Sequence, residues 1–229
     1  ALLPDAKKVE IQPVHEKGRP KFALERIPNT DVFEGVTTAA NAVYAYDLVI
    51  TSKAGHTRRT RDAYSFLPTL GEGDLYLFGK GDERKIYEKL GAQLRTIDGV
   101  PGTSFAVWAP NAQRVSVVGD FNGWDGRFHA LRLLGASGVW EIFIPGVGQG
   151  AHYKFDIRDA HGHVKLNTDP FGFFFEVAPK QAAIVWETKQ FKWTDDAWLK
   201  QRRKRDVLRS PMSVYELHVG SWQKKTPTE

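Results

Sequence analysis

The feature that most constrains the fold of this chain is an internal repeat. Residues 46–66 align with residues 153–173 at a constant offset of 107, and the alignment needs no gap. The matched positions include Tyr46 with Tyr153, Gly55 with Gly162, and Asp62 with Asp169. Self-similarity at a fixed offset indicates repeated copies of one structural unit. We therefore expect two modules of the same plan, with the two aspartates in equivalent structural roles.

A second similarity lies upstream of the first. Residues 4–9 align with residues 110–115 at an offset of 106, so one residue of slip falls in a loop. In the second copy, residues 103–108 read as a strand that leads to Pro110, whereas almost nothing precedes Pro4. We expect the first module to lack its opening strand and the chain to begin inside a domain.

Short strands separated by Gly, Asn, Asp and Pro dominate residues 100–187. The expected strands are 103–108, 114–118, 139–144, 151–157 and 183–186. Alternating or β-branched runs bounded by turn residues are typical of β structure, and about seven such strands indicate an immunoglobulin-like sandwich. The predicted fold class is therefore all-β, with two tandem immunoglobulin-like modules.

The modules are expected to be joined and followed by other structure. Residues 67–97 read as a bridge with a short helical segment around Ile86 and Leu90. Residues 194–206 are polar and free of proline, which predicts a helix with Thr194 as its N-cap. Residues 213–219 read as a buried strand that includes His218. Since no partner follows this strand, we expect that the chain has been cut there.

These features divide the chain into four segments. They are 1–66, the amino-terminal module; 67–97, the bridge; 98–190, the second module; and 191–229, the linker helix and terminal strand.

Composition excludes several classes of protein. The chain has no cysteine, so neither disulfides nor a thiolate metal site is possible, and a cytoplasmic location fits. No apolar run is long enough for a membrane span, and no signal-peptide pattern opens the chain. The net charge is +5, but the basic residues gather in two local clusters without interleaved aromatics. We expect no nucleic-acid partner, no membrane partner, no metal and no cofactor.

Catalytic signatures are also missing from the sequence. It has no serine elbow and no phosphate-binding loop. Glycoside chemistry needs two carboxylates about 5 to 9.5 Å apart across the scissile bond, and no pair stands out.

Trp124 is the best candidate for a ligand contact. It lies on a loop rich in Gly and Asn, where a ring is hard to bury fully, and its flat face suits the apolar side of a glucose ring. Lys154 can donate hydrogen bonds to sugar oxygens. For Trp108 and Trp140, which lie in predicted strands, core packing is expected.

Several motifs resemble one enzyme family. Residues 105–112, 115–124, 138–141 and 153–155 resemble the glycogen-binding module of branching and debranching enzymes. Residues 62–79 and 87–92 resemble the extra amino-terminal module and bridge of bacterial glycogen branching enzymes. Residues 211–222 resemble the first strand of their catalytic α/β barrel.

The resemblance implies an enzyme that cuts an α-1,4 glucan and rejoins the piece through an α-1,6 bond. Its retaining mechanism uses an aspartate nucleophile and a glutamate acid/base, which belong to later barrel strands. No catalytic residue is therefore expected in this chain. The implied partners are α-glucan and the protein's own catalytic barrel.

In related glycogen-binding modules, such as that of the AMP-activated kinase β subunit, two tryptophans, a lysine and an asparagine grip the sugar. Trp124 and Lys154 match the first tryptophan and the lysine. The region of the second tryptophan corresponds to residues 164–166, which include no aromatic residue. The place of the asparagine falls near Ala182. We therefore expect weak binding, sub-millimolar at best.

Three functional hypotheses remain open. The modules could hold glucan near a distant active site, they could be structural supports for the barrel without sugar binding, or they could dock protein partners.

Overall fold

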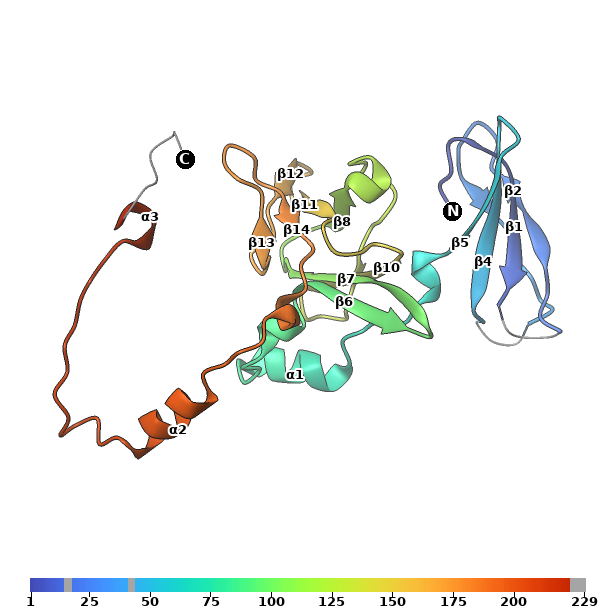
Figure 1. Ribbon diagram of the computed structural model, residues 1–229. Helices are drawn as coiled ribbons and strands as arrows, with labels where there is room; N and C mark the ends of the chain where they lie inside the picture. Colours follow the sequence, from blue (N-terminus) through green and yellow to red (C-terminus); the bar gives the residue numbers. More distant parts are fainter. Residues whose placement is uncertain (15–17, 41–43, 223–229) are drawn as a thin grey trace. The chain divides into compact units, whose positions relative to one another are not determined.

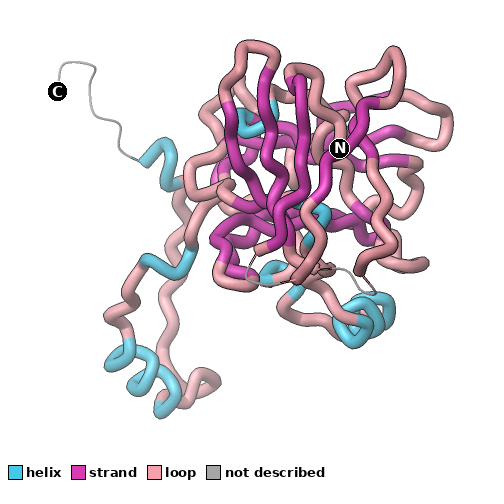
Figure 2. The backbone as a smooth tube through the Cα atoms, turned by 90° about the vertical axis from the view of Figure 1, so that its right-hand side faces the viewer, coloured by secondary structure: helices cyan, strands magenta, loops and turns pink. Residues whose placement is uncertain are grey.

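The computed structural model describes residues 1–14, 18–40 and 44–222. The chain divides into two compact units, residues 1–188 and residues 189–229. Figure 2 shows that strands dominate the first unit and that the helices are short. The all-β fold class predicted from the sequence is confirmed. None of the described helices has the length and apolar character needed to cross a bilayer.

The first module is an antiparallel sheet of five strands in the order β3-β2-β1-β4-β5 (Figure 1). Its strands are β1 (Ala6–Pro13), β2 (Phe22–Arg26), β3 (Phe33–Glu34), β4 (Tyr46–Ser52) and β5 (Thr57–Arg61). Side chains of a strand point to alternate sides. Val9 and Ile11 on β1 therefore share one side with Leu48 and Ile50 on β4, and these residues form the core of the module.

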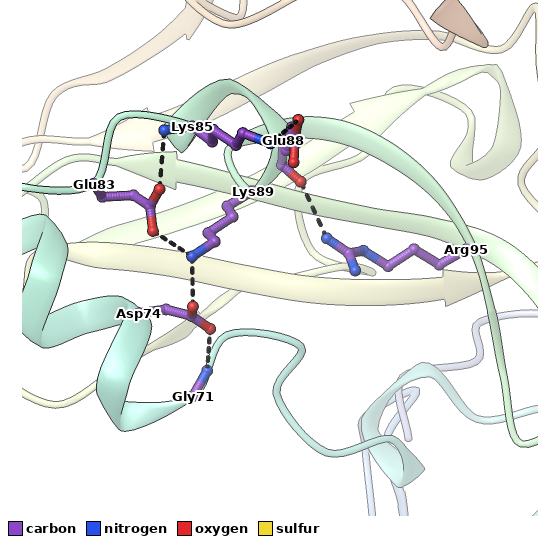
Figure 3. A network of polar contacts seen from close by, with 7 residues as sticks. All are labelled: Gly71, Asp74, Glu83, Lys85, Glu88, Lys89 and Arg95. Atoms are coloured by element: carbon purple, nitrogen blue, oxygen red, sulfur yellow. Dashed lines mark hydrogen bonds and ion pairs between the residues drawn. The ribbon is translucent and has the colours of Figure 1, made fainter. Parts of the chain in front are cut away.

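Three short helices follow β5: η1 (Ala63–Ser65) ends just before the bridge, and α1 (Glu72–Lys80) and η2 (Ile86–Glu88) lie within it. The predicted helical segment corresponds to η2. Asp74 of α1 accepts a hydrogen bond of 2.9 Å from the backbone N–H of Gly71, and Lys89 contacts both Asp74, at 2.5 Å, and Glu83 (Figure 3). These ionic contacts join α1 to the residue that follows η2, although partly exposed ion pairs stabilise a fold only slightly.

The second module is a sandwich of two sheets, as predicted. One sheet has the order β6-β7-β10-β9, and the other has the order β12-β11-β14-β13 with β8 paired to β11. The strands are β6 (Gly91–Ile97), β7 (Val100–Trp108), β8 (Arg114–Gly119), β9 (Arg132–Leu133), β10 (Val139–Pro145), β11 (His152–Arg158), β12 (Val164–Asn167), β13 (Phe174–Phe175) and β14 (Ala183–Ile184). Between the sheets, Phe105, Ile142, Tyr153 and Phe155 are fully buried. Because β6 pairs with β7 along its whole length, residues 91–97 belong to this sandwich although the sequence placed them in the bridge.

The two modules share their strand register, which confirms the repeat. In the first module Pro13 pairs with Tyr46, and in the second Gly119 pairs with Tyr153, at offsets of 106 and 107. The pairs Lys8–Thr51 and Leu48–Thr60 have the counterparts Arg114–Arg158 and Phe155–Asn167. The bridge between Leu2 and Val32 corresponds to the pair Trp108–Val139 in β7 and β10.

Of the two strand tryptophans, only Trp140 is buried as predicted. Trp140 is 8% exposed and lies in the core of the sandwich, where its Nε1 donates to the carbonyl of Ala109. Trp108 is 54% exposed, so the expectation of core packing is wrong for it. It is the last residue of β7 and lies on the outer side of its sheet, where its ring contacts Phe78 of α1.

The second unit begins within η4 (Thr188–Gln190), and its described part contains two further short helices, α2 (Asp196–Lys204) and α3 (Val219–Trp222). The helix predicted for residues 194–206 is α2, but its N-cap is Asp195 and not Thr194. The predicted strand at residues 213–219 is wrong: the chain there has no regular structure up to α3. A strand needs a partner for its backbone groups, and no described strand pairs with this segment. Accordingly His218 is exposed and not buried.

Candidate functional site

The strand β11 carries one of the two candidate residues, Lys154. Its neighbours Tyr153 and Phe155 point into the core, so His152, Lys154 and Asp156 point to the opposite side of the sheet. Residues directly opposite each other on paired strands share a side. Lys154 lies opposite Val118 of β8, and Asp156 lies opposite Leu166 of β12. We call the side of this sheet that bears His152, Lys154, Asp156, Val118 and Leu166 the outer face.

The ammonium group of Lys154 is available for a ligand. The side chain is partly exposed, and within the described residues it has no hydrogen-bond or ion-pair partner. An ammonium group has three donors and no acceptor. Lys154 can therefore direct up to three N–H groups at hydroxyl oxygens of a ligand lying on the outer face.

The loop that follows β8 carries the other candidate, Trp124. After the short helix η3 (Asp120–Asn122), Gly123 and Trp124 both adopt left-handed backbone conformations, with φ of 63° and 61°. Such a conformation is uncommon for residues other than glycine and costs conformational energy. The backbone N–H of Trp124 donates a hydrogen bond of 3.0 Å to the carbonyl of Gly119, which folds the loop back on the end of β8.

Asn122 anchors this loop to the sandwich. Its Oδ1 accepts from the backbone N–H of Gly119 at 2.9 Å, and its Nδ2 donates to the carbonyl of Val117 and to Nδ1 of His129, both at 2.9 Å. Burial lowers the pKa of His129 to about 4, so its imidazole is neutral at pH 7 and Nδ1 can accept. The loop is therefore held in place before any ligand arrives.

The indole ring of Trp124 is held at its edge. Its Nε1 donates a hydrogen bond of 3.0 Å to Oδ1 of Asp120, and Oδ2 of Asp120 lies 3.1 Å from Nδ1 of His152 on β11. Trp124 is 39% exposed, so part of the ring remains open to solvent. The structure thus connects Trp124, through two side chains, to the strand on which Lys154 lies two residues beyond His152.

An aromatic pair that sequence reasoning missed lies on the same face. Phe174 lies opposite Ile184, which in turn lies opposite His152, so all three share the outer face. The ring of Phe174 packs against Trp186 with centroids 4.7 Å apart, and both rings are partly exposed. Alternation along residues 152–158 could have placed His152 on the outer face, but the pairing of β13 with β14 could not be read from the sequence.

Near the place of the sugar-binding asparagine of related modules, this chain has Ala182. Ala182 is 2% exposed, and its backbone N–H donates a hydrogen bond of 3.0 Å to Oε2 of Glu176. On β12, Leu166 occupies the region of the second tryptophan and is 54% exposed. Over the described ranges, no group of three or more acidic or histidine side chains is placed to hold a metal ion.

Comparison with known proteins agrees with this geometry. Residues 89–172 match the family Carbohydrate-binding module 48 (Isoamylase N-terminal domain), a range that runs from before β6 to beyond β12. The 1,4-alpha-glucan branching enzyme GlgB of Methylococcus capsulatus is 46% identical over 225 residues, which are 98% of this chain and 30% of that enzyme. The GlgB of Rubrobacter xylanophilus shows the same identity and coverage.

The chain spans about 30% of the length of these relatives. Among solved structures, ligand-free PulA from Klebsiella pneumoniae matches 81% of this chain and 19% of its own, with a TM-score of 0.38 and 17% identity, which is too low to bear on the site. The resemblance noted in the sequence is confirmed: this chain is similar over nearly its whole length to the amino-terminal part of bacterial 1,4-alpha-glucan branching enzymes, and residues 89–172 match the model of carbohydrate-binding module 48.

Proposed function

We propose that the outer face of the second module binds an α-glucan chain. Trp124 stacks on the apolar side of one glucose ring, and Lys154 donates hydrogen bonds to hydroxyl groups of the same or the next sugar. The observation that carries the proposal is the combination of a partly exposed indole, fixed on a preorganised loop, with the Lys154 ammonium group on the adjoining sheet, which has no partner among the described residues. The match to a carbohydrate-binding family supports the same ligand class.

The affinity of this face is expected to be low. One stacking ring and a few exposed hydrogen bonds must offset the entropy that a flexible glucan loses on binding. Because the loop is already anchored by Asn122, the protein side adds little to that cost. We expect a dissociation constant on the order of a millimolar or slightly below.

We further propose a role in a longer protein. There the segments 1–66, 67–97, 98–190 and 191–229 act as a non-catalytic region that positions glucan and supports a catalytic barrel. The longer protein is a 1,4-alpha-glucan branching enzyme, as the names of its relatives suggest. By the resemblance noted in the sequence it forms α-1,6 branches, with its catalytic carboxylates outside this chain. A cytoplasmic location remains a prediction from the absence of cysteine.

The ligand proposal is tested by titrating the 229-residue chain with maltoheptaose, observed by NMR of the indole N–H groups and by calorimetry. The Trp124→Ala variant should lose all measurable affinity, and Lys154→Met should bind several-fold more weakly. Trp198→Ala is the matched control, because Trp198 is also exposed but lies on α2 in the other unit. Wild-type protein whose Trp124 signal does not move at millimolar maltoheptaose would contradict the proposal.

A further inference from the structure

We propose that Asp120 is a positioning residue for glucan binding, which sets the orientation of the Trp124 ring and is itself held by His152, a residue that Glu176 contacts from the other side of the ring. The inference rests on the proposed function of the outer face. It adds a set of residues that do not touch the sugar but determine how well Trp124 can stack on it.

The first step is the contact between the indole and the carboxylate. Trp124 has one polar ring atom, Nε1, and this atom donates to Oδ1 of Asp120 at 3.0 Å. The acceptor lies four residues earlier in the chain, so the loop that carries the ring also supplies its anchor. Without that bond a half-exposed indole can rotate about its side-chain torsions, and a ligand must then select one orientation at an entropic cost.

The second step is the support of Asp120 by the sheet. Its Oδ2 lies 3.1 Å from Nδ1 of His152, and Nε2 of His152 lies 3.7 Å from Oε1 of Glu176. Glu176 accepts through its other oxygen from the backbone N–H of Ala182. The chain of contacts therefore runs from the Trp124 loop across β11 to the connection between β13 and β14.

These groups lie around the outer face. His152 shares the outer face with Lys154, and Glu176 lies two residues after Phe174, which is also on that face. Oε1 of Glu176 also lies 3.7 Å from Nζ of Lys180, so this carboxylate contacts both His152 and Lys180. The contacts form a polar border beside the apolar rings, which fits a sugar with one apolar side and a rim of hydroxyls.

The expected effect is modest, because the side chain of Asp120 is 61% exposed. Solvent competes for an exposed hydrogen bond, so its loss should weaken binding of maltoheptaose by about three- to tenfold. Asp125 provides a matched control in the same loop. Among the described residues, the hydrogen bonds to its carboxylate all come from Arg127, the shortest at 2.6 Å from a guanidinium nitrogen.

The test compares maltoheptaose affinity of the 229-residue chain with the variants Asp120→Ala, Asp120→Asn, His152→Ala and Asp125→Asn. Asp120→Ala should bind three- to tenfold more weakly, and the Nε1–H resonance of Trp124 should move in the absence of ligand. Asp120→Asn should restore most of the affinity, because its amide oxygen can still accept from the indole. His152→Ala should show a smaller loss, and Asp125→Asn should bind within twofold of wild type.

Two results would overturn the inference. One is unchanged affinity of Asp120→Ala in a protein whose binding is abolished by Trp124→Ala. The other is an equal loss in Asp120→Asn and Asp120→Ala, which would show that the accepted hydrogen bond is not what matters. If Trp124→Ala itself binds normally, the proposed function fails instead. Should Asp120→Ala not fold, the comparison of Asp120→Asn with His152→Ala decides: normal binding by both also overturns the inference.

Discussion

The hydroxyl of Tyr153 donates a hydrogen bond of 2.5 Å to Oδ2 of Asp169, and the pair is repeated 107 residues earlier, where Tyr46 donates to Asp62 at 2.6 Å. The second oxygen of each aspartate accepts from the backbone N–H two residues later, that of Phe171 or Tyr64. In both modules the pair therefore ties a central strand to the turn after the next strand. The structural role predicted for the two aspartates is confirmed.

The Asp169 carboxyl should make stability depend on pH. It is 1% exposed, and burial raises its pKa to about 6, above its ordinary value of 3.8. Below about pH 4 both the folded and the unfolded chain hold this proton. Between about pH 4 and 6 only the folded chain retains it, so the contribution of this group to the free energy of unfolding falls as pH rises, by on the order of 3 kcal/mol in total.

Urea unfolding at several pH values between 4 and 7 checks this prediction. In the Asp169→Asn variant the side chain no longer titrates, so the free energy of unfolding should vary less over that range than in wild type. An identical pH dependence of the two proteins would show that Asp169 titrates at its ordinary value.

The buried ion pair between Arg132 and Glu141 should be strongly coupled. Glu141 is fully buried, its Oε1 accepts from the backbone and hydroxyl of Thr69, and its Oε2 lies 3.4 Å from Nε of Arg132. Arg132→Met should lower the free energy of unfolding by about 3 kcal/mol, because it leaves a buried carboxylate without its cation. Adding Glu141→Gln should recover at least half of that loss, and strictly additive losses in urea unfolding would contradict the coupling.

Gly119 is expected to tolerate no side chain. A Cβ at this position would lie 2.1 Å from the backbone carbonyl of His152, on the strand paired with it. Gly119→Ala should therefore destabilise the fold by about 1 to 3 kcal/mol and also weaken maltoheptaose binding, since it displaces His152 from Asp120. Gly148→Ala, which has no atom within 4 Å of its Cβ, is the control. Equal thermal unfolding temperatures of the two variants would show that the strands can separate locally at little cost.

A second aromatic ring on the outer face should tighten binding. Leu166 lies opposite Asp156 on this face and is exposed, so Leu166→Trp adds an indole beside Lys154. We expect maltoheptaose affinity to rise by about three- to tenfold, the gain typical of one additional stacking contact. In Lys165→Trp the new ring points to the other side of the sheet, because Lys165 lies opposite Ile157, and affinity should not change. An equal gain in both variants would indicate nonspecific adsorption.

Much of the scaffold could be predicted from the sequence, since the gap-free repeat reflects one strand register used twice. Residues that pair in one module have counterparts that pair in the other, as Lys8–Thr51 and Arg114–Arg158 illustrate. The helix α1 was not predicted, because Gly73 and Gly79 lie within it and glycine disfavours helix. The strand predicted for residues 213–219 was wrong for a different reason. The apolar pattern there is typical of a buried strand, but no described strand pairs with this segment.

The candidate site was predicted only in part. Trp124 was recognisable because a tryptophan on a Gly-rich loop has few ways to be buried, and Lys154 because it matches a family position. The contact of His152 with Asp120 joins residues 32 positions apart, and it follows from the register of β8 against β11. That register is a tertiary property, which neither local propensity nor composition specifies.

The first module carries different residues at the positions that correspond to the outer face of the second module. The counterparts of Lys154 and Leu166 at the offset of 107 are Asp47 and Arg59, whose side chains form an ion pair at 2.5 Å with Arg61 bound to the same carboxylate. The tyrosine–aspartate pair is thus shared by the two modules, whereas the residues at the outer-face positions differ. The glucan-binding proposal therefore applies to the second module alone, and no avidity from two copies of this face is expected.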